Sequence, residues 1–277
     1  MPEKTKKPER TAEEISEELL EKEISKELIK VDTRTDREKD NDREQAAKLA
    51  SWVPKTKLGR DVKAKKIKNI DEILESNQKI LEEQIVDTLL NLRSDLIFIG
   101  QSKGKFGGGK RRAWKQTQRK TKQKNVPTFS TLAVVGDENG HVGIGMGRAK
   151  ETLPSRDKAI RKAKLGITKV RRSCASFDCA CDEPHSLPFK VEGKSGSVKI
   201  VLIPAPQGTG LVVARELKKV LSLAGIRDIY SKTFGSVRTT TNLIRACMDA
   251  LKKTNKGGEQ FHGVNVSDIQ VRLRERK

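Results

Sequence analysis

The chain has 277 residues, a formal net charge of +21 and a pI of about 9.9. Hydrophobic residues make up 34 % of it and charged residues another 34 %, which favours one or two folded domains with polar extensions. Residues 1–50 hold 12 Lys/Arg and 15 Asp/Glu, whereas the rest of the chain holds 46 and 22. A body this basic favours a polyanionic partner.

Membrane, secreted and disulfide-stabilised classes are disfavoured. No apolar run approaches the ~20 residues of a membrane-spanning helix. The N-terminus, MPEKTKKPER, lacks the apolar region of a signal peptide. Four cysteines in 277 residues do not make a disulfide scaffold. We therefore expect a cytoplasmic protein with no membrane partner.

Residues 1–66 are predicted to form a charged extension, partly helical or disordered. A capping box begins at Thr11, and a narrow apolar stripe runs from Leu20 to Leu28. Both a solvated extension and a helix that docks on a partner fit this pattern. The end of the extension, from residue 51 onward, is a basic connector.

A helix and a short strand are predicted next. Residues 71–93 place four apolar side chains in one stripe, which is typical of an amphipathic helix. The stripe consists of Leu81, Ile85, Leu89 and Leu92. Ser94 and Asp95 should end this helix, and the apolar residues 96–99 then indicate a buried strand.

Residues 103–124 form a basic segment that is predicted to be a loop between two strands. It has ten Lys/Arg and no acidic residue, with Phe106 and Trp114 interleaved. These cations would repel one another in isolation, whereas neutralised phosphates would release counterions and favour binding. The segment therefore favours contact with RNA over the alternative, a merely solvated loop.

Residues 131–147 have the pattern of a β-hairpin. Asn139 and Gly140 suit its turn, and Val142, Ile144 and Met146 alternate along the return strand. Glycines occupy the intervening positions, which either close packing of the strand or close approach of RNA would explain. They match neither a dinucleotide-binding G-x-G-x-x-G turn nor a P-loop. The glycines are Gly143, Gly145 and Gly147.

A basic helix is predicted after the hairpin. Pro154 suits its first turn, and Ile160, Ala163 and Ile167 fall at helical spacing. Lys and Arg occupy the other positions around the helix. A hairpin backed by such a helix is a plausible RNA-facing unit.

Residues 173–185 contain a candidate metal site. Three thiols and one imidazole lie within 12 residues, and a Cys₃His set can bind Zn²⁺ tetrahedrally. The Cys-x₄-Cys-x-Cys-x₃-His spacing is not that of a standard zinc finger, so reduced cytosolic cysteines remain the alternative. The residues are Cys174, Cys179, Cys181 and His185.

Residues 186–254 are predicted to form a second αβ unit. Strands are expected at 187–191 and 198–203 around a turn at 193–196, followed by a helix that ends at Gly225, a strand at 226–233 and a helix at 242–253. Gly208 to Gly210 would either bind phosphate at a helix start or form a structural turn. Residues 255–277 are predicted to be a peripheral tail.

Three stretches in this order resemble the universal small-subunit ribosomal protein family numbered five in the bacterial series. They are VVGDENGHVGIGMGRAKE, SLPFKVEGKSGSVKIVLIPAPQGTGLVV and LAGIRDIYSKTFGSVRTTTN. The Cys/His segment and the IPAPQGTG sequence look like the archaeal branch. Relative to the family, residues 113–125 look inserted, and Met146 stands where an aromatic residue is usual.

The resemblance implies an α+β protein. Its first domain, at 67–172, would have a β-sheet with helices similar to a double-stranded-RNA-binding fold. Its second, at 186–254, would have a left-handed β-α-β crossover, against the usual right-handed rule. The resemblance also implies binding to small-subunit rRNA and to neighbouring ribosomal proteins, near the decoding region and the path by which mRNA enters. Members influence translational accuracy, so mRNA is an expected partner.

We therefore expect a structural, ribosome-bound component of the small subunit that is neither an enzyme nor a homo-oligomer. The residues expected to contact RNA are Lys103, Lys105, Lys110, Arg111, Arg112, Arg119, Lys120, Arg148, Lys150, Arg156 and Arg161. One structural Zn²⁺ is the expected cofactor, if any. The alternative is a free-standing double-stranded-RNA-binding regulator. A phosphate-transferring enzyme is disfavoured because no paired Asp/Lys site accompanies a glycine loop.

Overall fold

The computed structural model describes residues 47, 49–76, 78–101, 111–176, 179, 181 and 183–256. The predicted stripe from Leu20 to Leu28, three candidate RNA contacts (Lys103, Lys105 and Lys110) and the tail from 257 onward lie outside these residues. The chain divides into two compact units at Trp52/Val53, and the second unit contains every element described below. No helix in the described part is both long and apolar enough to cross a membrane.

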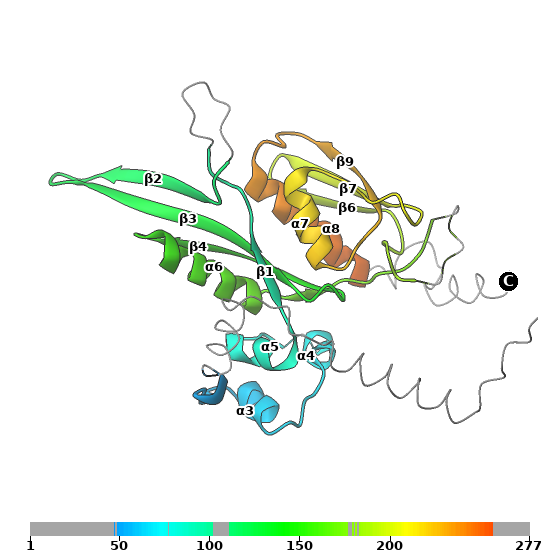
Figure 1. Ribbon diagram of the computed structural model, residues 1–277, viewed down its shortest axis with the longest axis horizontal. Coiled ribbons are helices and arrows are strands. Elements are labelled where there is room, and N and C mark those ends of the chain that lie inside the picture. The colour runs from blue at the N-terminus through cyan, green and yellow to red at the C-terminus, as the bar shows by residue number, and fades with distance from the viewer. Residues whose placement is uncertain are drawn as a thin grey trace, which may run out of the picture. The chain divides into compact units, whose positions relative to one another are not determined.

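The first sheet is antiparallel and is built around one long strand, β3 (Figure 1). One edge of β3 pairs with β1 near the hairpin turn and with β2 farther away, while the other edge pairs with β4. The strands are β1 (Arg93–Leu96), β2 (Trp114–Lys120), β3 (Asn125–Gly136), β4 (His141–Ala149) and the short β5 (Thr168–Lys169). The predicted hairpin is confirmed as β3 and β4.

Helix α6 (Thr152–Leu165) covers one face of this sheet at very close range. A Cβ atom at Gly145 would lie 2.2 Å from the Ala159 carbonyl oxygen, and one at Gly147 would lie 2.0 Å from that of Ser155. The buried side of α6 is correspondingly small, formed by Ser155, Ala159 and Ala163. Close packing therefore accounts for the glycines, and their face is not open to RNA.

The predicted stripe of this helix is therefore mostly wrong. Of its three residues only Ala163 faces the sheet with the buried small residues, while Ile160 is half-buried and Ile167 follows the helix. The strand leaves no space for large side chains, so small residues form the contact instead. The helix also begins two residues before Pro154.

The second sheet has the strand order β6-β7-β9-β8. Its strands are β6 (Val191–Ser195), β7 (Val198–Pro204), β8 (Leu211–Val212) and β9 (Ile229–Phe234). Two helices, α7 (Arg215–Leu223) and α8 (Thr240–Lys256), cover one face. β8 and β9 are parallel neighbours joined through α7, which is the predicted β-α-β crossover, and its hand stays a prediction. The predicted α+β fold is confirmed.

A single core joins the two sheets. Buried side chains from β3, such as Leu132 and Val134, belong to the same cluster as those of α7 and α8. The Glu138 backbone N–H donates to the Leu223 carbonyl at 3.0 Å, so the hairpin turn is bonded to the end of α7. The two αβ units are thus packed together, while the predicted domain boundaries at 66, 172, 185 and 254 stay predictions.

Several predicted strand limits are wrong. β1 begins at Arg93, so Ser94 and Asp95 lie inside it, and residues Trp114–Lys120 of the predicted basic loop form strand β2. β6 begins four residues later than expected. Gly193, expected in the turn, lies inside β6. A Cβ there would be 2.0 Å from the Ala246 carbonyl oxygen, so this strand position requires glycine, whereas the turn uses Gly196 at φ +60°.

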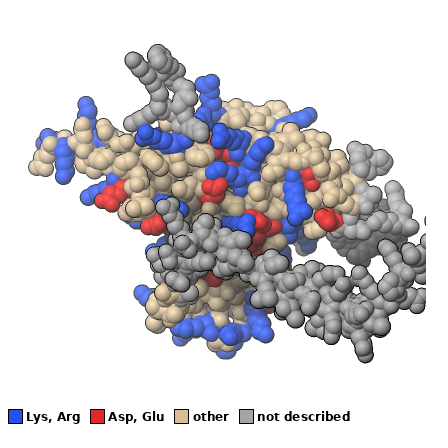
Figure 2. Space-filling view, viewed as in Figure 1, with Lys and Arg blue, Asp and Glu red and all other residues tan. Residues whose placement is uncertain are grey.

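The predicted helix at 71–93 is two helices, α4 (Ile70–Glu75) and α5 (Glu83–Leu89). Leu81, expected in the buried stripe, is 65 % exposed in the connection between them. This connection carries Glu82, whose carboxylate accepts hydrogen bonds from the backbone N–H groups of Lys55 and Thr56 at 3.0 and 2.6 Å. The bend thus holds the start of helix α3 (Lys57–Lys63), and Lys and Arg gather over that region (Figure 2).

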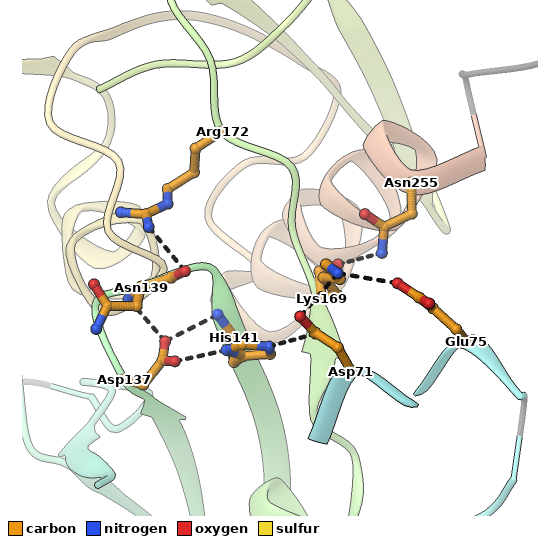
Figure 3. Close-up of polar contacts among 8 residues, drawn as sticks. All are labelled: Asp71, Glu75, Asp137, Asn139, His141, Lys169, Arg172 and Asn255. Carbon is orange, nitrogen blue, oxygen red and sulfur yellow. Dashed lines mark hydrogen bonds and ion pairs between the residues drawn. The ribbon is translucent and has the colours of Figure 1, made fainter. Parts of the chain in front are cut away.

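A polar network fixes α4 to the first sheet (Figure 3). The His141 ring lies between two carboxylates, with Nδ1 at 2.6 Å from Asp137 and Nε2 at 3.0 Å from Asp71. The Lys169 ammonium binds the other oxygen of Asp71 at 2.9 Å and also reaches Glu75 at 3.1 Å. The network therefore joins the hairpin turn, β5 and α4.

The same contacts shift the protonation of the histidine. Burial alone would lower the pKa of His141, but hydrogen bonds and attraction from Asp137 and Asp71 outweigh it, so this pKa is raised. The histidine in turn lowers the pKa of both carboxyl groups, against the opposing effect of their own burial. Protonated His141 is therefore the form that the fold stabilises.

We expect Gly145→Ala to lower the free energy of unfolding by about 1–3 kcal/mol, because the new methyl group would force α6 away from β4. Urea unfolding would measure this. Gly166→Ala is the matched control, since its Cβ would come no nearer than 3.3 Å to a neighbour and should change stability by about 0.5 kcal/mol or less. Equal stability of the Gly145→Ala and wild-type proteins would refute the packing argument.

We expect the stability difference between the wild type and His141→Gln to depend on pH. Because the folded-state pKa of His141 is raised, its contribution is fully present below the unfolded pKa of about 6.5 and is lost as pH rises through the folded value. Urea midpoints of both proteins across this range would measure the difference. A difference that stays constant with pH would contradict the assignment.

Candidate nucleic-acid interface and metal centre

The C-terminal end of β2 and the N-terminal end of β3 form a two-stranded ribbon that extends beyond the rest of the first sheet (Figure 1). β4 ends opposite Phe129, so residues 125–128 of β3 pair only with β2 among the described strands. At the tip, the Thr121 N–H donates to the Lys124 carbonyl at 3.0 Å. A lone ribbon is only marginally stable in water, and this one is held because β3 continues into the core.

The ribbon is strongly basic. The predicted contacts Arg119 and Lys120 lie on β2 and are exposed. Lys115, Lys122 and Lys124 are also exposed on the ribbon but were missed as individual contacts. The high positive charge of the segment indicated RNA contact. Because the segment was predicted to be a loop, however, the sequence provided no strand position from which to choose individual cations.

Two predicted contacts, Arg111 and Arg112, lie exposed at the base of β2. The Arg112 guanidinium is 6.0 Å from the centre of the Trp114 ring, and the Arg112 carbonyl accepts a hydrogen bond from the Gly100 N–H at 2.9 Å. A Cβ at Gly100 would lie 2.2 Å from the Trp114 carbonyl oxygen, so this crossing depends on glycine. The base of the ribbon is therefore well fixed.

The remaining predicted contacts lie where β4 ends and α6 begins. Arg148 pairs with Ser130 beside the start of the ribbon, Lys150 follows it, and both are exposed. Arg156 and Arg161 are exposed along α6. The structure thus places the described candidates on the ribbon and on the elements beside its start, with Arg161 the farthest along the helix.

These cations differ from others in how their charge is balanced. None of the eight described candidates forms an ion pair with another described residue. In contrast, Lys164 pairs with Asp87 at 2.7 Å and Lys219 with Asp95 at 2.9 Å. Exposed cations without internal partners are the groups that can neutralise phosphates without losing an existing contact.

The predicted metal residues come together in the segment between the two sheets. The three sulfur atoms and one imidazole nitrogen lie within 4.8 Å of one another. Cys179 Sγ is 3.0 Å from Cys181 Sγ and 3.5 Å from His185 Nε2, and Cys181 Sγ is 3.4 Å from Cys174 Sγ. A Cys₃His group that could hold one metal ion is therefore present.

The thiols interact strongly with one another. Hydrogen bonds from Cys181 lower the pKa of Cys179 to about 6, with help from backbone groups. Burial and the neighbouring sulfur atoms raise the pKa of Cys174 to about 12. Thiolates at these distances would repel one another electrostatically, and a bound dication would neutralise that repulsion.

His185 is held by the second αβ unit. Its side chain is 2 % exposed, and its Nδ1 lies 2.8 Å from a carboxylate oxygen of Asp228, although the two are not aligned as a hydrogen bond. Asp228 is also buried, and its other oxygen accepts a hydrogen bond from the Gly210 N–H at 2.8 Å. β8 separates Gly210 from α7, so these glycines form a structural turn and not a helix start.

Comparison with known proteins identifies the family. Residues 113–171 match the family model "Ribosomal protein S5, N-terminal domain", and residues 193–260 match "Ribosomal protein S5, C-terminal domain". The first match covers β2 to β5, and the second covers most of the second sheet together with α7 and α8.

Relatives from three archaea, each named "Small ribosomal subunit protein uS5", cover most of this chain. The protein of Nanoarchaeum equitans is 48 % identical over 74 % of this chain and 88 % of its own length. That of Thermofilum pendens is 47 % identical over 73 % and 94 %, and that of Staphylothermus marinus 44 % over 75 % and 91 %. The chain therefore belongs to the small-subunit ribosomal protein S5 family, as its resemblance to the archaeal branch predicted.

Proposed function

We propose that this chain is a structural, RNA-binding component of the small ribosomal subunit, bound to ribosomes in the cytoplasm. The observation that supports this most is the basic ribbon, a two-stranded projection whose exposed cations form no ion pair with another residue of the described part. Proteins of this family are named for that subunit in the related archaea.

The ribbon is suited to binding folded RNA rather than to packing on its own chain. β2 exposes every residue from Lys115 to Lys120, so its side chains reach outward on both faces. Neutralising phosphates with these cations releases counterions, which gives affinity without base-specific contacts. The cations beside the start of the ribbon would extend this contact along the same RNA.

The finer assignment follows from the family. We propose that the protein lies near the decoding region and the path by which mRNA enters, where it contributes to translational accuracy and contacts mRNA. The outer face of the second sheet is suited to neighbouring ribosomal proteins, since it exposes Val212, Tyr230 and Phe234. A homo-oligomer is not part of this proposal.

The proposal assigns no catalysis to the chain. Of the histidines in the described part, His141 lies between two carboxylates and His185 faces three thiols. His185 does lie 3.5 Å from the Cys179 thiol, but we assign both side chains to the metal cluster and not to a nucleophile–base pair. The runner-up is a free-standing regulator that binds double-stranded RNA, which the sedimentation experiment below distinguishes.

We also propose that Cys174, Cys179, Cys181 and His185 hold one structural Zn²⁺. Zinc is supported by the number and type of ligands and by Asp228 beside the far ring nitrogen, since ligating histidines commonly contact a carboxylate there. Ser186 Oγ also donates to the Asp228 carbonyl at 2.6 Å. The ion would fix the segment between the two sheets onto the second sheet.

We expect the wild-type protein to sediment with small subunits in sucrose gradients at low and at moderate salt. The variant Arg119→Gln/Lys120→Gln/Lys122→Gln should leave the subunits as salt is raised, because it loses three potential phosphate contacts. The matched control, Lys218→Gln/Arg245→Gln/Lys252→Gln, removes three exposed cations from α7 and α8 and should behave as the wild type. Wild-type protein at the top of the gradient, even at low salt, would instead favour the free regulator.

We expect about one zinc per chain in protein purified under reducing, chelator-free conditions. Cys179→Ser should lose it, and Asp228→Asn should retain the site but bind zinc about 10–100-fold more weakly. Cys247→Ala is the control, because this buried thiol lies on α8 and not in the cluster. Metal analysis and competition with a chelator would measure these effects, and metal-free wild-type protein would end the zinc proposal.

A further inference from the structure

A second basic surface surrounds helix α3, far from the ribbon in sequence. Residues 55–68 contain seven basic side chains and one acidic one, Asp61. All seven are exposed, whereas Asp61 is half-buried. The α3 surface, as we name it here, consists of Lys55, Lys57, Arg60, Lys63, Lys65, Lys66 and Lys68.

The α3 surface is held in place by the fold. Thr56 Oγ1 accepts a hydrogen bond from the Gly59 N–H at 3.0 Å, and Glu82 accepts from the N–H groups of Lys55 and Thr56. Val62 is 3 % exposed, and α3 packs on α5, which in turn packs on α6. The cations of the predicted basic connector are therefore presented from and beside the packed helix α3.

Seven cations against one carboxylate leave the segment 55–68 with a large local positive charge. Lys66 pairs with Asp61 at 3.7 Å, with the lysine side chain 73 % exposed. Such an exposed pair contributes little to stability. Grouping seven cations here costs free energy in the isolated protein, and an external anion would recover it.

We propose that the α3 surface binds phosphates of small-subunit rRNA as a second contact, separate from the ribbon. Lysine is depleted at protein–protein interfaces, whereas Lys and Arg make most contacts to nucleic-acid phosphates. The surface therefore fits RNA better than an acidic protein. This inference rests on the proposed RNA-binding function. It adds a second site, and none of the eleven predicted contact residues belongs to it.

The two basic surfaces face different parts of the surroundings. In Figure 1 the ribbon extends at the upper left, whereas α3 lies at the bottom, beyond α5. Figure 2 shows Lys and Arg along that lower edge. Two rigid cationic surfaces in one compact unit would bind two segments of rRNA and fix their relative positions.

The experiment compares three full-length variants with the wild type. The α3 variant carries Lys57→Gln, Arg60→Gln and Lys68→Gln, and the ribbon variant and the α7/α8 control are those used for sedimentation. Binding to small-subunit rRNA is measured between about 50 and 200 mM salt, and hydroxyl-radical footprinting maps the protected nucleotides. Urea unfolding of each variant verifies that it is folded.

We expect the α3 variant to reduce the slope of log affinity against log salt by about 2, at roughly 0.7–0.9 per lost phosphate contact. It should lose protection at one rRNA segment while keeping that of the ribbon, and the ribbon variant should show the reverse. A folded α3 variant with the wild-type slope and footprint would overturn the inference but leave the proposed function intact.

Two further outcomes are informative. If the α3 variant binds rRNA normally but no longer joins assembled subunits, the surface serves a protein neighbour and the inference is wrong. If the wild type shows neither a salt-dependent affinity nor a footprint, the proposed function fails together with the inference.

Discussion

The rest of the structure depends on the contact between the glycine strand β4 and the small-residue side of α6. Backbone lies against backbone there, and Ser155 Oγ adds a 3.1 Å hydrogen bond to the Gly147 carbonyl. This contact holds β4, and with it the paired strand β3, against α6. Because β3 belongs both to the core and to the ribbon, the close packing of β4 on α6 helps to position the cations at the ribbon surface.

The two αβ units share this arrangement through a single core. Side chains of β3 on the face opposite α6 belong to the same cluster as α7, and the hairpin turn is hydrogen-bonded to the end of that helix. The His141 network then adds α4 on a third side. Each basic surface is consequently connected to the core through a short path of packed elements, which is the rigidity needed to position RNA.

Sequence patterns predicted much of this arrangement where local signals dominate. The Asn139–Gly140 turn, the glycine stop at Gly225 and the Cys₃His group follow from local chemistry, and all were found. Contacts between distant segments were harder. Leu81 has helical spacing, but the bend that exposes it places Glu82 to accept hydrogen bonds from the backbone N–H groups of Lys55 and Thr56. Likewise Gly193 resembles a turn residue, yet the close approach of Ala246 on the distant helix α8 requires it to be glycine.

The exposed edge of the ribbon affects how readily the free protein aggregates before it binds a partner. β2 pairs only with β3 among the described strands, so its outer edge presents backbone N–H and C=O groups that another chain could extend into a larger sheet. Charged side chains, lysine above all, are a common natural protection against such edge-to-edge aggregation. The cations of the ribbon would thus repel those of other newly made chains and prevent edge-to-edge pairing. Binding to a polyanion would then neutralise these charges and cover the ribbon.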